Sequence, residues 1–160
     1  IGECKALQVL ALGNNQLAGV PRELCQLSAL RELDVSHNRL EELPLGMGSM
    51  SALQSLRVGH NRLRAVPEEL ARLPSLTSLS LPANLITTIP TAVLLGCTAL
   101  RALDVHSNPV TVQQLREVEG WEAFDARRRK ACDKAIDSRV LGGTNGFDEG
   151  ADEQQWRRWC

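Results

Sequence analysis

The sequence repeats an apolar pattern with a period of 23 residues, and this period constrains the fold more than any other feature. Aligned units begin at Ala6, Ala29, Ala52, Ser75 and Ala99, and each reads L-x-x-L-x-L/V-x-x-N-x-L/I/V. A unit of this length cannot bury its own apolar face, so successive units have to stack on one another. The sequence therefore predicts a solenoid.

Each unit contains a short stretch in which apolar and polar residues alternate. In the second unit, Leu33 and Val35 alternate with polar residues at 32, 34 and 36, which is typical of a strand with one buried face. Strands one unit apart run parallel, about 4.8 Å from each other. We expect five such strands, near Val9–Ala11, Glu32–Asp34, Ser55–Arg57, Ser78–Ser80 and Ala102–Asp104.

Two further positions recur in the units. An asparagine follows each strand, at positions 15, 38, 61, 84 and 108. A buried turn leaves backbone N–H and C=O groups that strand pairing does not satisfy, and a side-chain amide can serve both kinds of group. We therefore interpret the asparagines as structural. A proline at positions 21, 44, 67 and 90 predicts short helical or irregular segments on the convex side, because proline cannot donate to a sheet.

The repeat breaks after Asn108-Pro109. Thr111 is a suitable N-cap for a helix over 112–119 that ends at Gly120, and a second helical pattern runs from Trp121 to about residue 139. We interpret 111–139 as a helical cap over the open end of the apolar columns. The basic run 127–130 resembles a nuclear-import or nucleic-acid patch, but interleaved acidic residues favour a solvated helix face.

Residues 140–160 form a Gly-rich acidic tail that ends with a tryptophan pair. Trp156 and Trp159 are three residues apart, so one helical turn places both on one side. Such a pair suggests a docking element that binds protein. Docking on the solenoid of the same chain is the preferred interpretation, and docking on a partner or the absence of a fixed structure are the alternatives.

The repeats, which we place at 1–110, resemble the short intracellular leucine-rich-repeat class that includes Ras-pathway scaffolds. The run from Asn108 to Phe124, with Leu-Arg-Glu-Val-Glu-Gly-Trp at 115–121, is similar to the C-terminal cap of the leucine-rich-repeat-containing protein fifty-seven group. The segments 133–138 and 146–152 resemble its plant and green-algal members. The resemblance implies an α/β solenoid with a curved parallel sheet on its concave side, and an intracellular binding module without an agreed biochemical activity.

The beginning of the chain predicts further repeats before it. Ile1 and Cys4 fall on the last two apolar positions of an earlier unit, so we expect the repeat region to be N-terminally truncated. Animal members of the resembled group begin with a myristoylation-type glycine, and that segment is absent here. Membrane contact is therefore expected only if a missing N-terminus is lipidated.

Composition excludes several classes of function. A formal net charge of −1 gives no reason to expect nucleic acid as a partner. The five cysteines are scattered without a C-x-x-C pair, so zinc-ligand spacing is absent. Clustered terminal cysteines and N-x-S/T acceptors are also absent, which favours a reducing, cytoplasmic setting.

The candidate binding site is the concave face, formed by strand residues that point away from the core. Asp34 and Arg57 are lateral neighbours with opposite charge, and such an exposed pair is more useful for recognition than for stability. His37 and His60 occupy equivalent positions, but zinc requires three or four ligands and Ala83 comes next. We predict a mainly polar protein-binding face centred on Glu32, Asp34, Arg57, Asp104 and His106.

The sequence contains no arrangement that supports catalysis. No Ser-His-Asp or Cys-His set falls in one column, and Asp34 and Asp104 lie three strands apart, roughly 14 Å. No phosphate-binding glycine loop is present. We therefore expect no enzyme, cofactor, metal or small-molecule substrate. The favoured function is a protein–protein interaction module, a scaffold or adaptor in intracellular signalling. The alternative is a structural subunit of a large intracellular assembly, for example a ciliary or cytoskeletal one.

Overall fold

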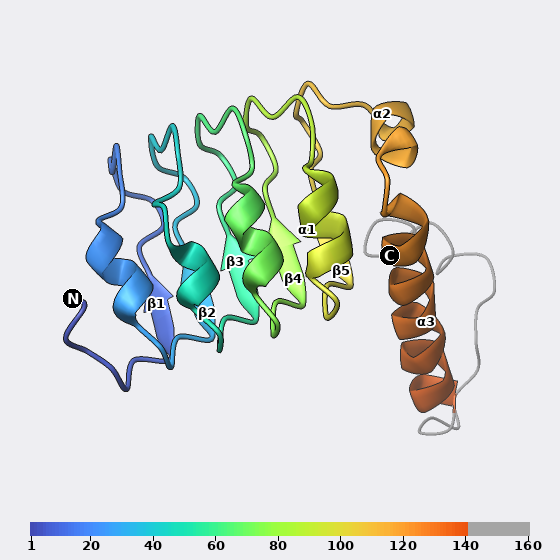
Figure 1. The fold of residues 1–160 in the computed structure, drawn as a ribbon, viewed down its shortest axis with the longest axis horizontal. Coiled ribbons are helices and arrows are strands. Elements are labelled where there is room, and N and C mark those ends of the chain that lie inside the picture. The colour runs from blue at the N-terminus through green and yellow to red at the C-terminus, as the bar shows by residue number, and fades with distance from the viewer. Residues whose placement is uncertain (141–160) are drawn as a thin grey trace.

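The structure is a computed structural model that describes residues 1–140, with side chains described as far as residue 133. Five strands form one sheet in chain order, and every neighbouring pair is parallel (Figure 1). They are β1 Val9–Ala11, β2 Glu32–Asp34, β3 Ser55–Arg57, β4 Ser78–Ser80 and β5 Ala102–Asp104. The predicted strands and the solenoid are confirmed.

The sheet register follows directly from the repeat period. Leu10 pairs with Leu33, Leu33 with Leu56, Leu56 with Leu79, and Leu79 with Leu103. Because equivalent residues of adjacent units are paired, each apolar position of the unit becomes a column that runs through the solenoid. In the second, third and fourth units the strand leucines at 33, 56 and 79 are buried, whereas Leu10 and Leu103 at the two ends are partly buried.

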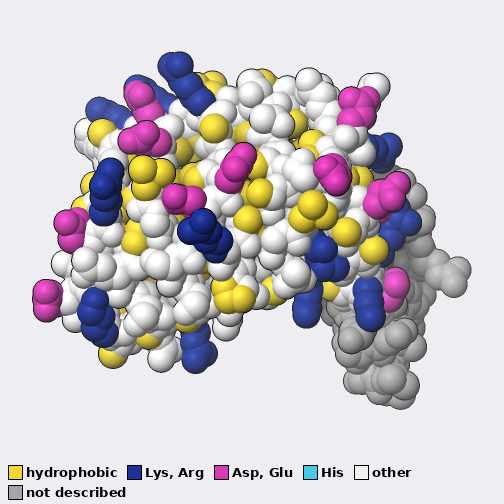
Figure 2. All heavy atoms as spheres, in the orientation of Figure 1, with side chains coloured by type: hydrophobic (Ala, Val, Ile, Leu, Met, Phe, Trp, Pro, Cys, Tyr) yellow, Lys and Arg dark blue, Asp and Glu magenta, His cyan; other side chains and the backbone are white. Residues whose placement is uncertain are grey.

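Short helical segments form the opposite side of the solenoid and lie in front of the strands in Figure 1. They are the 3₁₀ helices η1 Arg22–Gln26, η2 Met47–Ser49 and η3 Glu68–Arg72, followed by the α-helix α1 Thr91–Gly96. Proline precedes three of them, at 21, 67 and 90, as expected for a residue that presets the backbone but cannot donate a hydrogen bond. Lys and Arg side chains are interspersed with Asp and Glu on this face (Figure 2).

The second unit departs from this rule. Pro44 lies three residues before η2, and Gly46 directly precedes the helix with a φ of 98°. Glycine adopts this left-handed conformation without the steric penalty of a Cβ atom. The left-handed turn at Gly46 thus delays the helix and leaves η2 with three residues.

Two glycines on the convex side allow the helical segments of neighbouring units to pack closely. A Cβ atom at Gly48 would lie 2.7 Å from the Glu69 carbonyl oxygen of the next unit, and a Cβ atom at Gly96 would lie 2.6 Å from the Ala71 carbonyl oxygen of the preceding unit. Such distances are too short for a carbon–oxygen contact, so both positions require glycine. Sequence reasoning missed both of these close approaches.

Asn38, Asn61 and Asn84 form the predicted ladder of buried turns, whereas Asn15 at the first unit is exposed and Asn108 at the last is partly buried. The Asn61 amide nitrogen donates to Val35 O of the preceding unit and to Val58 O of its own unit, both at 3.0 Å. Its side-chain oxygen accepts from Leu40 N at 3.0 Å. Asn38 and Asn84 make the equivalent bonds, so each amide ties one unit to the one before it.

Two helices follow the last strand, α2 Val112–Glu117 and α3 Trp121–Val140. Thr111 caps α2 as predicted, in a reciprocal capping box with Gln114. Helix α2 ends two residues earlier than expected, because Val118 has an extended backbone. Gly120, with a φ of 91°, turns the chain into α3, which packs against α1 and α2.

Arg127 corrects the prediction that the basic run is a solvated helix face. Its guanidinium donates to Leu94 O at 2.6 Å, near the end of α1, and to Leu100 O at 3.4 Å. Phe124, one turn earlier, is 1% exposed and belongs to the same core as the leucine columns. Helix α3 therefore attaches to the last unit through one buried aromatic ring and one guanidinium group.

Candidate functional site

The exposed face of the sheet carries the side chains that alternate with the buried leucines. The register places Val9, Glu32 and Ser55 side by side, and Ala11, Asp34 and Arg57 in the next column. At the other end of the sheet, Ser80 pairs with Asp104. The structure thus brings Glu32, Asp34 and Arg57 together, whereas Asp104 lies three strands away from Asp34.

Asp34 has two roles on this face. One carboxylate oxygen lies 3.9 Å from Arg57 Nη1, and the Arg57 side chain is 58% exposed, so this ion pair contributes little to stability. The other oxygen accepts from Ser36 N at 2.9 Å and from the Ser36 hydroxyl. Asp34 therefore satisfies the backbone at the end of β2 as well as presenting charge.

Asp104 repeats this arrangement at the end of β5. Its Oδ1 accepts from His106 N at 3.1 Å and lies 2.6 Å from His106 Nδ1. An aspartate that accepts the backbone N–H two residues later forms an Asx-type turn, which fixes the direction of the carboxylate. The predicted residues Asp104 and His106 thus form a pre-oriented pair that is separate from the group around Asp34.

Glu32 differs from both aspartates because it makes no hydrogen bond or ion pair within the described part of the chain. It borders a small hollow of about 80 Å³ together with Val9, Asp34, Ser55 and Arg57. Val9 is 57% exposed and supplies an apolar wall. This hollow combines an exposed apolar surface, an unpaired carboxylate and an exposed guanidinium.

The two histidines of neighbouring units stack on each other at the turn after the strands. The ring centroids of His37 and His60 are 4.1 Å apart, with an interplanar angle of 11°. Both residues have a left-handed backbone, with φ of 53° and 55°. In the described residues no group of three or more histidine, cysteine or acidic side chains could hold a metal ion.

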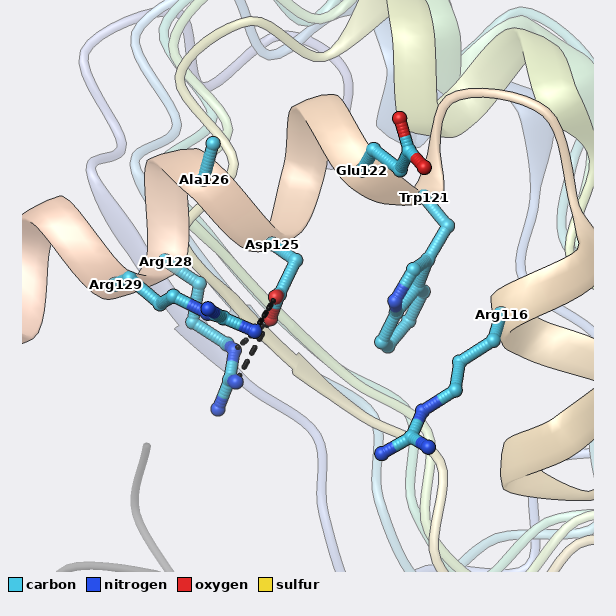
Figure 3. A pocket seen from close by; sticks show the side chains of 7 residues that line it. All are labelled: Arg116, Trp121, Glu122, Asp125, Ala126, Arg128 and Arg129. Atoms are coloured by element: carbon cyan, nitrogen blue, oxygen red, sulfur yellow. Dashed lines mark hydrogen bonds and ion pairs between the residues drawn. The ribbon is translucent and has the colours of Figure 1, made fainter.

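A second hollow lies on the helical segment and was not found by sequence reasoning. It has a volume of about 630 Å³ and is lined by Arg116, Trp121, Glu122, Asp125, Ala126, Arg128 and Arg129. Figure 3 shows the Trp121 ring between the Arg116 side chain and the carboxylate of Asp125, whereas Glu122 and Ala126 point to the other side of α3. Trp121 is half-buried and packs against Phe124, with ring centroids 5.5 Å apart.

Asp125 is the charged centre of this hollow. It accepts from Arg128 Nη2 at 2.8 Å and pairs with Arg129 Nη2 at 2.6 Å. Burial raises the pKa of the Asp125 carboxyl, but the hydrogen bonds and charges of Arg128 and Arg129 outweigh burial, so that the pKa is lowered. One carboxylate thus neutralises only one of the two guanidinium charges that it binds.

Among the described cysteines, Cys25 and Cys97 are not activated nucleophiles, because the pKa of each thiol is raised. Burial raises the pKa of the Cys97 thiol to about 11, although the Arg127 charge lowers it, and the thiol donates to Leu70 O at 3.0 Å. Burial and the charge of Glu69 also raise the pKa of Cys25. Cys4, Cys25 and Cys97 are free, whereas Cys132 is disulfide-bonded, so the scattered cysteines alone do not argue for a reducing compartment.

The remaining predicted site residues, Trp156 and Trp159, lie outside the described residues. Their docking therefore stays a prediction. No helix in the described part of the chain combines the length and apolar character needed to cross a membrane.

Comparison with known proteins places these features in a family context. The family described as leucine rich repeat matches residues 2–40 and 51–110. The plant intracellular Ras-group-related LRR protein 8 of Oryza sativa subsp. japonica is 47% identical over 66 residues, which are 41% of this chain and 17% of that protein. Protein 7 of the same group and organism is 42% identical over 60 residues, which are 38% of this chain and 23% of that protein. The chain thus spans less than a quarter of the length of these relatives.

Solved structures show the same fold. A leucine-rich repeat protein of Leptospira interrogans superposes with a TM-score of 0.66 at 36% identity, covering 69% of this chain and 28% of that one. The ectodomain of the Arabidopsis thaliana membrane receptor kinase GASSHO1/SCHENGEN3, in complex with Casparian strip integrity factor 2, gives a TM-score of 0.62 at 32% identity. That match covers 68% of this chain and 13% of the receptor.

Proposed function

The chain belongs to the leucine-rich repeat family, and we propose that it is a non-catalytic protein–protein interaction module whose concave sheet face binds a protein partner. The observation that carries this proposal is the contrast between the two faces of the sheet. The inward-facing position is leucine in all five strands, whereas the outward positions change in size and charge from strand to strand. A surface that varies on a constant scaffold is suited to selective recognition.

The binding face centres on Glu32, Asp34, Arg57, Asp104 and His106. Three carboxylates and one guanidinium give it an excess of negative charge, which favours a partner with basic side chains. The hollow beside Glu32 adds the exposed Val9 surface, on which the aliphatic part of a lysine or arginine could pack. Nucleic acid is disfavoured by the same negative charge.

The proposed setting is intracellular signalling, with the chain acting as a scaffold or adaptor in the cytoplasm. Two relatives from rice carry the name of plant intracellular Ras-group-related LRR proteins, and they support this setting. The sequence resemblance of residues 108–124 to the leucine-rich-repeat-containing protein fifty-seven group fits the same role. Receptor ectodomains with this fold, in complexes such as that of GASSHO1/SCHENGEN3 with its factor, support a protein as the ligand.

The test is charge reversal on the concave face. The variant with Asp34→Arg and Arg57→Glu should lose the partners that the parent chain captures from plant extract under identical conditions. Glu32→Lys should have the same effect and is the cleaner substitution, since Glu32 makes no hydrogen bond or ion pair in the part of the chain that the structure describes. Glu41→Lys changes the net charge equally at an exposed position outside the sheet and should retain the partners. Capture that survives both concave-face variants would remove this face as the binding site.

A further inference from the structure

The hollow on the helical segment has the composition of a binding site, although the proposed function does not use it. Trp121 contributes an indole ring that is only half-buried, and arginines surround it on α2 and α3 (Figure 3). Tryptophan and arginine are the residues most often found to dominate binding energy at protein interfaces. The concave face contains no aromatic residue on its five strands.

The side of α3 that carries the indole is positively charged. Arg116, Arg128 and Arg129 contribute three guanidinium groups there, and among the described residues that line the hollow only Asp125 directs a carboxylate toward them. Arg116 makes no hydrogen bond or ion pair within the described residues. Glu122 also borders the hollow, but it points to the other side of the helix. A complementary occupant would therefore combine acidic side chains with an apolar group.

The end of this chain has that composition. Residues 148–153 contain four acidic side chains, and Trp156 and Trp159 follow within six residues. This is the most acidic stretch of six residues in the sequence, and the run Trp-Arg-Arg-Trp at 156–159 begins three residues after it, so that residues 148–159 keep a net charge of −2. Charge complementarity and the indole surface of Trp121 thus favour the chain's own C-terminal end over an unrelated segment.

The length of the chain allows this segment to return to the hollow. Helix α3 runs to Val140, which lies about 22 Å along the helix axis beyond Asp125 at 1.5 Å per residue. The eight residues 141–148 span at most about 26–29 Å when extended. Asp148 can therefore reach the guanidinium groups near Asp125 without any change in α3. The glycines at 142, 143 and 146 place few steric limits on a reversal of the chain.

We propose that the hollow lined by Arg116, Trp121, Arg128 and Arg129 is an intramolecular docking site for residues 148–159 of the same chain. In this arrangement the acidic side chains bind the arginines that Asp125 leaves unneutralised. Trp156 and Trp159 cover the exposed part of the Trp121 ring. A protein that binds residues 148–159 would expose the Trp121 surface. The hollow could then bind a second protein, but only while residues 148–159 are displaced from it.

The experiment uses the full chain, labelled with ¹⁵N and kept under reducing conditions. The indole N–H signals of the three tryptophans are assigned with single Trp→Phe variants and compared with those of a free peptide of residues 141–160. We expect the Trp156 and Trp159 signals of the full chain to differ from those of the peptide. Arg116→Glu and Arg129→Glu should move these signals to the peptide positions. Replacement of the four acidic residues 148–153 by their amides should do the same and should also shift the Trp121 signal.

Lys130→Glu is the matched control, because Lys130 is exposed, adjacent to Arg129 and not part of the hollow. It should leave all three indole signals at their positions in the parent chain. The proposal is overturned if the Trp156 and Trp159 signals of the parent chain coincide with those of the free peptide. It is also overturned if Lys130→Glu acts like Arg129→Glu. Signals that depend on protein concentration would assign the occupant to a second copy of the chain and would equally overturn it.

Discussion

The asparagine ladder should show energetic coupling between neighbouring units, because two amides share one carbonyl group. Val35 O accepts from the amide of Asn38 and from the amide of Asn61, each at 3.0 Å. Either amide alone keeps this buried oxygen satisfied. The free-energy cost of removing both should therefore exceed the sum of the two single costs.

The magnitudes follow from the groups that each substitution leaves unpaired. Asn61→Ala leaves Leu40 N without its acceptor, which is expected to cost about 1–3 kcal/mol of unfolding free energy. Asn38→Ala leaves Leu17 N unpaired, at a similar or smaller cost because this site is partly buried. The double variant additionally leaves Val35 O unpaired, so we expect a coupling energy of about 0.5–3 kcal/mol.

Two controls are present in the same chain. Asn38 and Asn84 share no hydrogen-bond partner, so this pair should be additive within about 0.5 kcal/mol. Asn15 is exposed, and within the described residues its side chain makes only the hydrogen bonds that its amide donates to Leu12 O and Gly13 O. Since Leu12 O also accepts from Asn38, Asn15→Ala should cost less than about 1 kcal/mol.

The assay is urea unfolding of the parent chain, the single variants and the two double variants. The midpoints are compared only where the slope of the transition is unchanged, because a changed slope signals loss of two-state behaviour. Additivity of Asn38→Ala with Asn61→Ala would refute the shared-carbonyl argument. An equal cost for Asn15→Ala and Asn61→Ala would show that burial of the amide does not determine its contribution.

Three further perturbations test other parts of the fold. Gly96→Ala should destabilise by about 1–3 kcal/mol because its Cβ would meet Ala71 O, whereas Gly19→Ala, with open space around it, should be neutral or slightly stabilising in thermal unfolding. Ala83→Asn should stabilise by up to about 1 kcal/mol in urea unfolding, because Ala83 has a φ of 51° that asparagine tolerates better; destabilisation would contradict this. The pKa of Asp125 is lower in the folded state, so its stabilising contribution is present above the unfolded-state pKa and is lost as pH falls through the folded-state pKa. Asp125→Asn should therefore lose less stability than the parent chain on acidification from neutral pH to below pH 4, and identical pH profiles would count against the Arg128 and Arg129 pairing.

The strands and the ladder could be predicted because the repeat converts sequence spacing into spatial neighbourhood. A residue and its equivalent one period later lie on adjacent strands, so Asp34 and Arg57 were placed together from their numbers alone. The same reasoning placed Asp104 and His106 on the face. Sequence reasoning missed that Asp34 and Asp104 each accept a hydrogen bond from the backbone N–H two residues later. An aspartate at the end of a strand is a signal for a turn of this kind.

The contacts of α2 and α3 could not be predicted as the strand contacts were, because these helices lie outside the 23-residue repeat. Arg127 belongs to a basic run that a helical wheel assigns to solvent, yet its guanidinium reaches two backbone carbonyls of the last unit. Arg116 on α2 and Trp121 on α3 line the same hollow, and Gly120 adopts a left-handed conformation between the two helices. Both the Arg127 contacts and the hollow depend on how the helices are placed against the solenoid. A pattern within one helix does not contain this information.

The distribution of hydrogen bonds separates the parts of the molecule that maintain the fold from those that are free to recognise a partner. The asparagine amides satisfy the turns, and the leucine columns fill the core, so neither requires a particular residue at positions such as 32, 55 or 78. Asp34 and Asp104 serve both the fold and the exposed face, because each also accepts a backbone hydrogen bond in the turn at the end of its strand. Within the described residues Glu32 makes no hydrogen bond or ion pair, so the fold of this part of the chain does not depend on its carboxylate. A change in binding caused by Glu32 can therefore be assigned to recognition, whereas a change caused by Asp34 has to be separated from its effect on the turn after β2.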